Sequence, residues 1–217
     1  MGLTSKERVL TTFEHKEPDR VPAWCGSSDE FWTKAKTELG LDDEGLSQRF
    51  GDDFRRFMAT YAGPDFELEH EGATCRTVFG IEREGMGYGQ PIGHPLANAT
   101  IDDIHEYPWP DPAWMDVSGI RPAAEPYCRE YAILGGDWSP FWHDAIDLLG
   151  MEELMVKMYE DPELVDALMK YLVDYYAGVS QRIFEAAGDV IDIFFIGNDF
   201  GSQTGPLLGE NLFRRFI

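Results

Sequence analysis

The chain has 217 residues and a mass of 24.6 kDa, and its 18 lysines and arginines against 40 aspartates and glutamates give a formal charge of −22. Phosphate backbones and anionic membrane surfaces attract basic patches, so this charge argues against binding to nucleic acid or to such a membrane. The 43% hydrophobic and 13% aromatic content is that of a folded globular protein. No apolar run approaches the ~20 residues that a membrane-spanning helix needs.

Helix and strand signals alternate along the first half of the chain. Thr4 and Glu7 have the spacing of a capping box, which predicts a helix that Pro18 stops. Ser27 and Glu30 open a second helix in the same way. The other elements expected here are a strand at 21–25, a short helix at 46–50, a strand at 54–61, a hairpin strand at 74–82 and a short helix that starts at Thr100.

The second half carries stronger signals. Asp161 and Pro162 form a helix start, because an acidic N-cap is followed by proline at the first helical position. Apolar residues at helical spacing follow until Gly188 ends the helix. Residues 190–196 (VIDIFFI) are nearly all apolar, as expected for a strand covered on both faces. The other expected elements are helices at 122–130, 140–149 and 151–159, a buried strand at 131–134 and a last helix that begins at Glu210.

Strands that alternate with helices in this way predict a parallel α/β sheet with about four βα units, in a single domain over residues 1–217. Ligand sites in such folds lie at the C-terminal ends of the strands. We therefore expect functional residues in the loops after Cys25, Tyr61, Leu134 and Ile196.

The cysteines indicate the compartment. Cys25, Cys75 and Cys128 lie far apart and form neither a CxxC nor an HxC pair, so local spacing predicts no zinc site. An odd, sparse set is typical of free thiols in a reducing compartment. The N-terminal segment has no apolar stretch of the kind found in a signal peptide. We therefore expect a cytoplasmic protein.

The chain resembles the uroporphyrinogen decarboxylase superfamily in three blocks that occur in the family's order: SKERVLTTFEHKEPDRVPAW, HPLANATIDDIHEYPWPDP and GNDFGSQTGPLLGENLFRRFI. The resemblance implies a (β/α)8 TIM barrel, of which this chain would hold about half. It also implies that residues 1–217 are the N-terminal part of a longer protein or one piece of a split one. A half barrel exposes unpaired sheet edges, which the missing half or a homodimer partner would cover.

The superfamily contains decarboxylases and cobamide-dependent methyltransferases, and both remain open. A decarboxylase must hold a polycarboxylate substrate, which requires arginine. Residues 21–33 contain no Arg or Lys and include Asp29 and Glu30. This favours a corrinoid-linked methyltransferase that moves a methyl group between a cobamide and a small-molecule acceptor, with a corrinoid protein as a partner. A non-catalytic half barrel that docks on a corrinoid protein is a third interpretation.

The methyltransferase reading implies zinc and a corrinoid (cobalamin) as cofactors. In that branch zinc lowers the pKa of a thiol, and its ligands are a His-x-Cys pair and a later Cys. Those ligands would lie beyond residue 217, so we expect no metal ligand within this chain. Cys25 as a metal-bound thiolate is a less common case than a buried free cysteine. A true decarboxylase of the family would need neither cofactor.

The candidate catalytic residues are Asp199, Asp137 and His143. Asp199 lies in the loop GNDFGSQ, whose glycines allow the backbone to approach a ligand. Asp137 follows the strand at 131–134 in GGDWSP, and His143 lies one turn into the next helix. Each has a structural alternative, because the two aspartates can cap a turn or a helix and a lone histidine is usually a surface or packed residue.

The candidate substrate-binding residues lie beside these positions. Asn198 and Gln203 flank Asp199 in the loop after the last expected strand, and Trp138 follows Asp137. Trp24 ends the first expected strand, where it either lines an apolar pocket for a corrin or aryl group or packs in the core.

Overall fold

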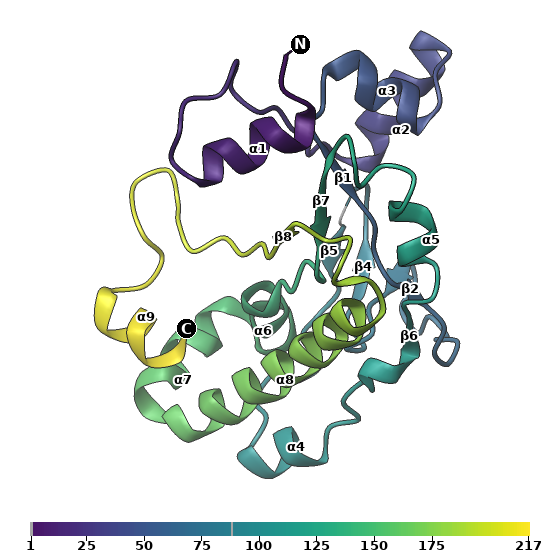
Figure 1. The fold of residues 1–217 in the computed structure, drawn as a ribbon. Coiled ribbons are helices and arrows are strands. Elements are labelled where there is room, and N and C mark those ends of the chain that lie inside the picture. Colours follow the sequence, from purple (N-terminus) through teal and green to yellow (C-terminus); the bar gives the residue numbers. More distant parts are fainter. Residues whose placement is uncertain (1, 88) are drawn as a thin grey trace. The chain divides into compact units, whose positions relative to one another are not determined.

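The computed structural model describes residues 2–87 and 89–217, in which helices and strands are mixed along the chain (Figure 1). This confirms the α/β fold class. The helices are α1 (Ser5–Phe13), α2 (Asp29–Leu39), α3 (Asp43–Phe50), α4 (Ile101–Glu106), α5 (Ile120–Ala124), α6 (Phe141–Leu149), α7 (Met151–Glu160), α8 (Pro162–Ala187) and α9 (Glu210–Phe216), with a short 3-10 helix η1 (Pro112–Trp114). The strands are β1 (Phe54–Arg56), β2 (Thr60–Tyr61), β3 (Cys75–Arg76), β4 (Glu82–Glu84), β5 (Gln90–Pro91), β6 (Met115–Asp116), β7 (Ala132–Gly135) and β8 (Ile193–Phe194).

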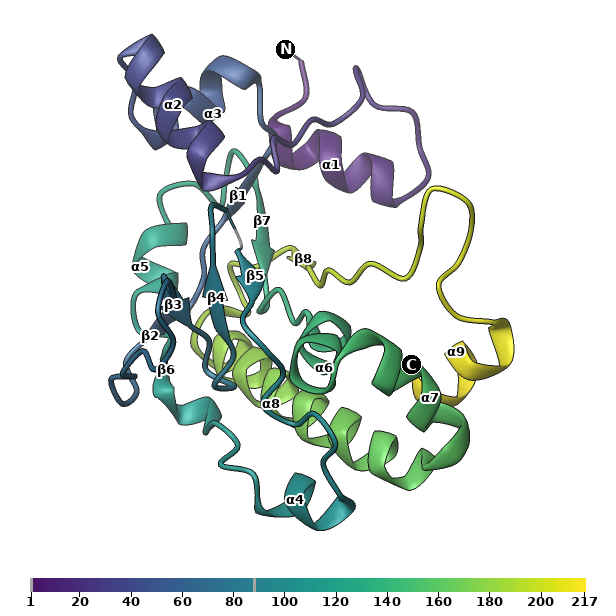
Figure 2. The same ribbon diagram turned by 180° about the vertical axis from the view of Figure 1, so that it is seen from behind.

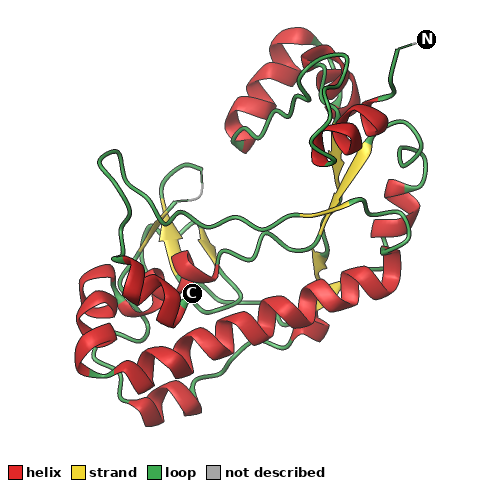
Figure 3. Cartoon of the chain, turned by 60° about the vertical axis from the view of Figure 1, so that its left-hand side comes forward, coloured by secondary structure: helices red, strands yellow, loops and turns green. Residues whose placement is uncertain are grey.

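The chain forms two compact units, each assembled from segments far apart in the sequence. Unit 1 contains the residues up to Thr60 together with 116–137 and 181–195. Unit 2 contains residues 61–115, 138–180 and 196–217. The long helix α8, seen along its length in Figure 3, supplies residues to unit 2 up to Ser180 and to unit 1 from Gln181 onward.

Unit 1 is built on a parallel sheet in the order β1-β7-β8. Phe54 of β1 pairs with Ala132 of β7, and Leu134 of β7 pairs with Ile193 of β8. All residues of β7 are buried, as its central position requires. In the part of the chain that the structure describes, this sheet has three strands and is open, so the closed TIM barrel implied by the resemblance is not shown.

Several expected elements differ from the structure. The strand expected at 54–61 is divided into β1 and β2, and the helix expected at 122–130 is the shorter α5, which ends at Ala124. Residues 21–25 lie beside the start of β1, where the Asp53 N–H donates to the Ala23 carbonyl at 2.9 Å, but they form no strand. Pro22 cannot donate to a ladder, which explains the interruption. Residues 190–196 contain only the two-residue β8, with Phe194 56% and Ile196 51% exposed. The expected cover on both faces is therefore wrong for this segment.

Asp53, directly before β1, is a fully buried carboxylate of unit 1. Its carboxylate accepts hydrogen bonds of 2.7–2.8 Å from the guanidinium groups of Arg8 and Arg20, the Ser5 hydroxyl and the Ala23 N–H. Burial acts to raise the pKa of Asp53, but these hydrogen bonds, led by those from Arg20 and Ala23, lower the pKa below its ordinary value. The cluster ties α1 and the segment that follows it to the start of β1.

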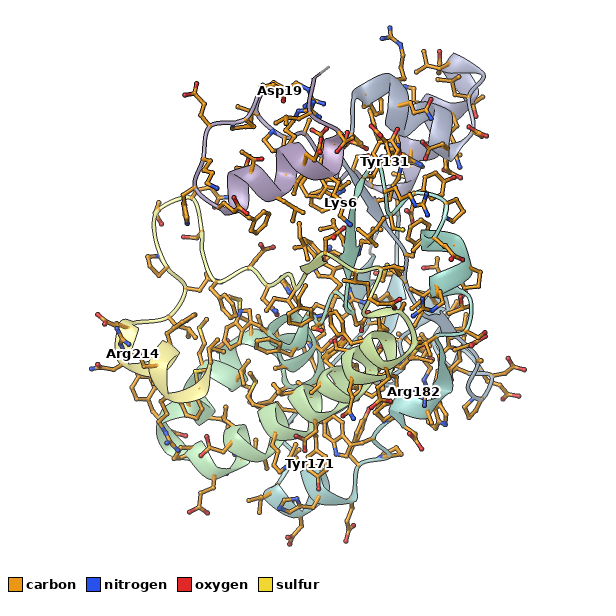
Figure 4. The ribbon with its side chains drawn as sticks, in the orientation of Figure 1. Lys6, Asp19, Tyr131, Tyr171, Arg182 and Arg214 are labelled. Carbon is orange, nitrogen blue, oxygen red and sulfur yellow. The ribbon has the colours of Figure 1, made fainter. Side chains whose placement is uncertain are left out.

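Helix α1 begins where the sequence places it. The Thr4 hydroxyl accepts from the Glu7 N–H, and the Glu7 carboxylate accepts from the Thr4 N–H, which confirms the capping box. Lys6, labelled in Figure 4, forms an ion pair of 2.7 Å with Asp192, directly before β8. Helix α4 starts with a second capping box, at Thr100.

Unit 2 combines an antiparallel sheet in the order β3-β4-β5 (Figure 2) with helices α6 and α7 and the first part of α8. The hairpin strand expected at 74–82 is divided between β3 and the start of β4. Helix α8 begins at Pro162, as expected, and buries one face. The residues of that face in unit 2 that are no more than 5% exposed are Leu164, Val165, Leu168, Met169, Leu172, Tyr175 and Val179.

Among the described residues, no helix combines the length and the hydrophobicity needed to cross a bilayer, and this includes α8.

Candidate functional site

The loop that follows β8 lies over the N-terminal end of α6, within unit 2. The Asn198 side chain holds the two segments together: its Oδ1 accepts from the Trp142 N–H, and its Nδ2 donates to the Ser139 carbonyl, both at 2.9 Å. The Gly197 N–H donates to the Trp138 carbonyl at 2.8 Å. Asn198 therefore satisfies one of the open donors at the start of α6 and fixes the loop in place.

Gly197 is the tightest point of this contact. A Cβ at this position would lie 2.0 Å from Nε1 of Trp138, well inside van der Waals contact. We expect Gly197→Ala to lower the free energy of unfolding by about 1–3 kcal/mol, because an added methyl group must displace the indole. Thermal or urea unfolding measures this change. Gly209→Ala is the matched control, since nothing lies within 4 Å of its Cβ position; equal stability of the two variants would contradict the close contact.

His143 and Asp199 meet at this place. Nε2 of His143 lies 3.5 Å from Oδ2 of Asp199, and the two side chains are 37% and 89% exposed. His143 is in the first turn of α6 and Asp199 follows Asn198. The hydrogen bonds of Asn198 with residues 139 and 142 therefore bring His143 and Asp199 together. Phe200 anchors the loop further, with its ring centroid 5.9 Å from that of Trp142. The result is an exposed imidazole with a carboxylate beside it, a pair that can accept or release a proton.

The structure thus brings four predicted site residues into one place in unit 2 and leaves three apart. The four are Asn198, Asp199, His143 and Trp138. Gln203 lies exposed farther along the loop, within the turn that hydrogen bonds from Ser202 to the Gly205 carbonyl close.

Asp137 and Trp24 belong to unit 1. Asp137 follows Gly136, whose φ of +90° and contact with Phe194 leave no room for a side chain. Trp24 is 47% exposed, and its ring meets Phe195 edge to face at 5.4 Å. Trp24 is thus a partly exposed ring that rests on an aromatic neighbour and is not packed in the core, and its expected role in substrate binding stays a prediction.

A second polar cluster in unit 2 was not predicted. Glu82, 4% exposed, accepts from the N–H groups of Glu69 and His70 at 2.7 and 2.9 Å and lies 2.7 Å from Nδ1 of His70. The backbone N–H of Glu69 lowers the pKa of Glu82, and the His70 contacts add to this against the effect of burial. A cavity of about 260 Å³ adjoins the cluster and is also lined by Arg76 and His94. The signal that the sequence analysis missed is Glu82 itself, an acidic residue at a buried position of the short strand β4.

The possible metal-ligating side chains are scattered over the described residues. Among residues 2–87 and 89–217, no three side chains of His, Cys, Asp or Glu lie close enough together to hold a metal ion. The nearest candidates, His143 with Asp199 and His70 with Glu82, are pairs. The described residues therefore do not provide a zinc centre.

Comparison with known proteins gives a fold relationship. The chain is similar to a solved methyltransferase from Methanosarcina mazei, with a TM-score of 0.62 and 19% sequence identity, over 99% of this chain. This chain spans 64% of the length of that protein. A scan against family models and a search of curated proteins found no match. At this identity the similarity establishes the fold that the two chains share.

Proposed function

We propose that this chain belongs to a methyltransferase of the uroporphyrinogen decarboxylase superfamily, which moves a methyl group between a cobamide and a small acceptor. The similarity to a solved methyltransferase over 99% of the chain is the observation that carries the proposal. The order of the three sequence blocks supports the superfamily. Because that methyltransferase is longer than this chain, the activity is proposed for the whole protein to which these residues belong.

In this proposal the His143–Asp199 pair removes the proton of the methyl acceptor. An acceptor thiol or alcohol must lose its proton as its sulfur or oxygen forms the new bond to the methyl carbon and the bond from that carbon to the methyl donor breaks. His143 accepts that proton at Nδ1, the ring nitrogen that does not face Asp199, and the Asp199 carboxylate, 3.5 Å from Nε2, stabilises the resulting imidazolium. Asn198 positions both groups through its hydrogen bonds to residues 139 and 142.

The described residues do not fit either cofactor as a resident group. They contain no cluster of ligands for zinc. The cavity of unit 1, about 320 Å³, is at the lower end of the roughly 300–1,000 Å³ range of ligand pockets, which is small for a corrinoid. We therefore derive no step through zinc, and we propose that the cobamide is presented by a corrinoid protein.

Decarboxylation of a polycarboxylate is the weaker alternative. Three arginines of unit 1 that could clamp carboxylates are bound to acids of the chain itself. Arg8 and Arg20 contact Asp53, and Arg55 forms two hydrogen bonds of 2.7 Å with Glu44. A guanidinium already neutralised in this way adds little attraction for a further anion.

We expect His143→Ala to lower the rate of methyl transfer by about 10²- to 10⁴-fold, the usual contribution of a general base. The assay follows loss of methylcobalamin with a small thiol acceptor, using the full-length protein that contains this chain. Asp199→Asn keeps the size of the side chain and removes its charge, so we expect a smaller loss.

His105→Ala is the matched control, because His105 is exposed on α4 and contacts Tyr171 instead of the loop. Unchanged turnover in His143→Ala would remove the assigned role of the histidine. Absence of methyl transfer in the unaltered full-length protein would overturn the proposed function.

A further inference from the structure

A separate cavity of about 320 Å³ lies in unit 1, along the edge of β1. The segment at Trp24 and Cys25, helices α2 and α3, and Tyr127 enclose it together with β1. None of these residues takes part in the proposed proton transfer. The lining combines aromatic rings with three carboxylates and with the guanidinium groups of Arg55 and Arg56, so its formal charge is negative. Aromatic faces beside a carboxylate attract a positively charged ligand.

Asp52 is the key carboxylate of this cavity. The residue is 6% exposed and lines the cavity. Its Oδ1 accepts from the Cys25 N–H at 2.6 Å, and its own N–H donates to the Ser47 carbonyl at 3.0 Å, so its position is fixed. Burial raises the pKa of Asp52, although the bond from Cys25 and the charge of Arg55 oppose the rise. A desolvated carboxylate of this kind gains most from a cationic partner.

The neighbouring acids already have partners. The Glu44 carboxylate accepts two hydrogen bonds of 2.7 Å from the Arg55 guanidinium, one from Nε and one from Nη2. Asp43 accepts from the indole N–H of Trp32 at 2.7 Å and pairs with Lys36 at 2.8 Å. Within the described part of the chain, Asp52 is thus the lining carboxylate that has no ion-pair partner within 4 Å.

Five aromatic side chains line the cavity: Trp24, Trp32, Phe54, Phe57 and Tyr127. Trp24 is 47% exposed and leans edge-on against Phe195. The Arg56 guanidinium lies over the ring of Phe195, 4.6 Å from its centroid. Tyr127 stacks on Phe57, with ring centroids 5.9 Å apart. Indole and phenol faces attract an organic cation and bury its hydrocarbon part at the same time.

We propose that this cavity binds a small arylalkylammonium ion, with its ammonium group at Asp52 and its hydrocarbon body against the indole rings of Trp24 and Trp32. The ammonium N–H groups supply the second hydrogen bond that the carboxylate can accept. The site is independent of the proposed methyl transfer, so either can fail without the other.

Isothermal titration calorimetry with benzylammonium tests this proposal. Benzyl alcohol and benzoate, which have a similar shape, serve as the neutral and the anionic control ligand. We expect the protein to bind benzylammonium at least tenfold more tightly than either control ligand. Quenching of tryptophan fluorescence provides a second readout, because Trp24 and Trp32 line the cavity. No binding of benzylammonium at millimolar concentration, or tighter binding of benzoate, overturns the proposal.

Asp52→Asn is the decisive variant, because its amide oxygen keeps the hydrogen bond from Cys25 while the charge is lost. We expect at least a tenfold loss of benzylammonium affinity and little change for benzyl alcohol. Asp43→Asn, whose carboxylate is already paired with Lys36, is the matched control and should change the affinity less than threefold. Equal losses in the two variants contradict the assignment, and if Asp52→Asn does not fold, the comparison of the three ligands decides.

Discussion

Asp53→Asn is expected to lower the free energy of unfolding by about 3–5 kcal/mol, the cost of removing one partner from a buried ion pair. The carboxylate of Asp53 is fully buried and holds the guanidinium groups of Arg8 and Arg20. An amide keeps the volume, but it leaves Arg20 without its anion and Arg8 with Asp19 alone, and one of its polar atoms is a donor that faces other donors. Chemical denaturation measures the loss.

The pH dependence gives the same substitution a distinct signature. The pKa of Asp53 is lower in the folded state than its ordinary value near ~4, so its contribution is present above that value and is lost as the pH falls through the folded-state pKa. We therefore expect the unaltered protein to lose more stability than Asp53→Asn when both are acidified below pH ~4. Asp65→Asn, at an exposed position, should stay within about 0.5 kcal/mol of the unaltered protein. Equal effects of the two substitutions would show that the buried cluster does not stabilise unit 1.

Trp142→Ala is expected to cost about 3–5 kcal/mol, the range for truncation of a large buried aromatic side chain. Trp142 is fully buried in α6, its ring packs near Phe200, and its backbone N–H donates to Oδ1 of Asn198. The substitution opens a cavity directly beside His143. Thermal unfolding measures this cost as a fall in the melting temperature relative to the unaltered protein.

Tyr159→Ala is the control for Trp142→Ala, because it removes an aromatic ring that is 75% exposed on α7 of the same unit. We expect its stability to change by less than about 0.5 kcal/mol. A Trp142→Ala protein as stable as this control would mean that the ring does not form part of the core of unit 2.

Helix starts were the part of the fold that the sequence predicted best. Thr4 with Glu7 and Asp161 with Pro162 mark α1 and α8 within a residue of their observed starts. These signals work because a cap and the first turn lie within a few residues of each other, so the information is local. Strands were predicted less well, since burial of an apolar run such as 190–196 depends on which distant segments cover it.

The candidate site shows the same limit. The pattern GNDFGSQ was enough to single out Asn198 and Asp199, and the helix after Pro140 was enough to suggest His143. The distance between His143 and Asp199 depends on the close contact of Gly197 with Trp138, which no local sequence pattern predicts. Asp137 precedes Trp138 in the sequence, yet the two belong to different units. The buried carboxylates of Asp53 and Glu82 escaped prediction because their partners come from separate segments.

The order of the strands in unit 1 has a consequence for the synthesis of the protein. β1 ends at Arg56, but its neighbour β7 begins at Ala132 and β8 begins at Ile193. During translation β1 therefore has no parallel partner until the ribosome has added all of β7, and β8 joins only after α8 has been made. Such long-range pairings close large loops and form slowly, whereas the local contacts of a helix form early. A nascent chain stalled before residue 193 should thus carry helices α1 to α8 with an incomplete sheet, a state in which chaperones can bind.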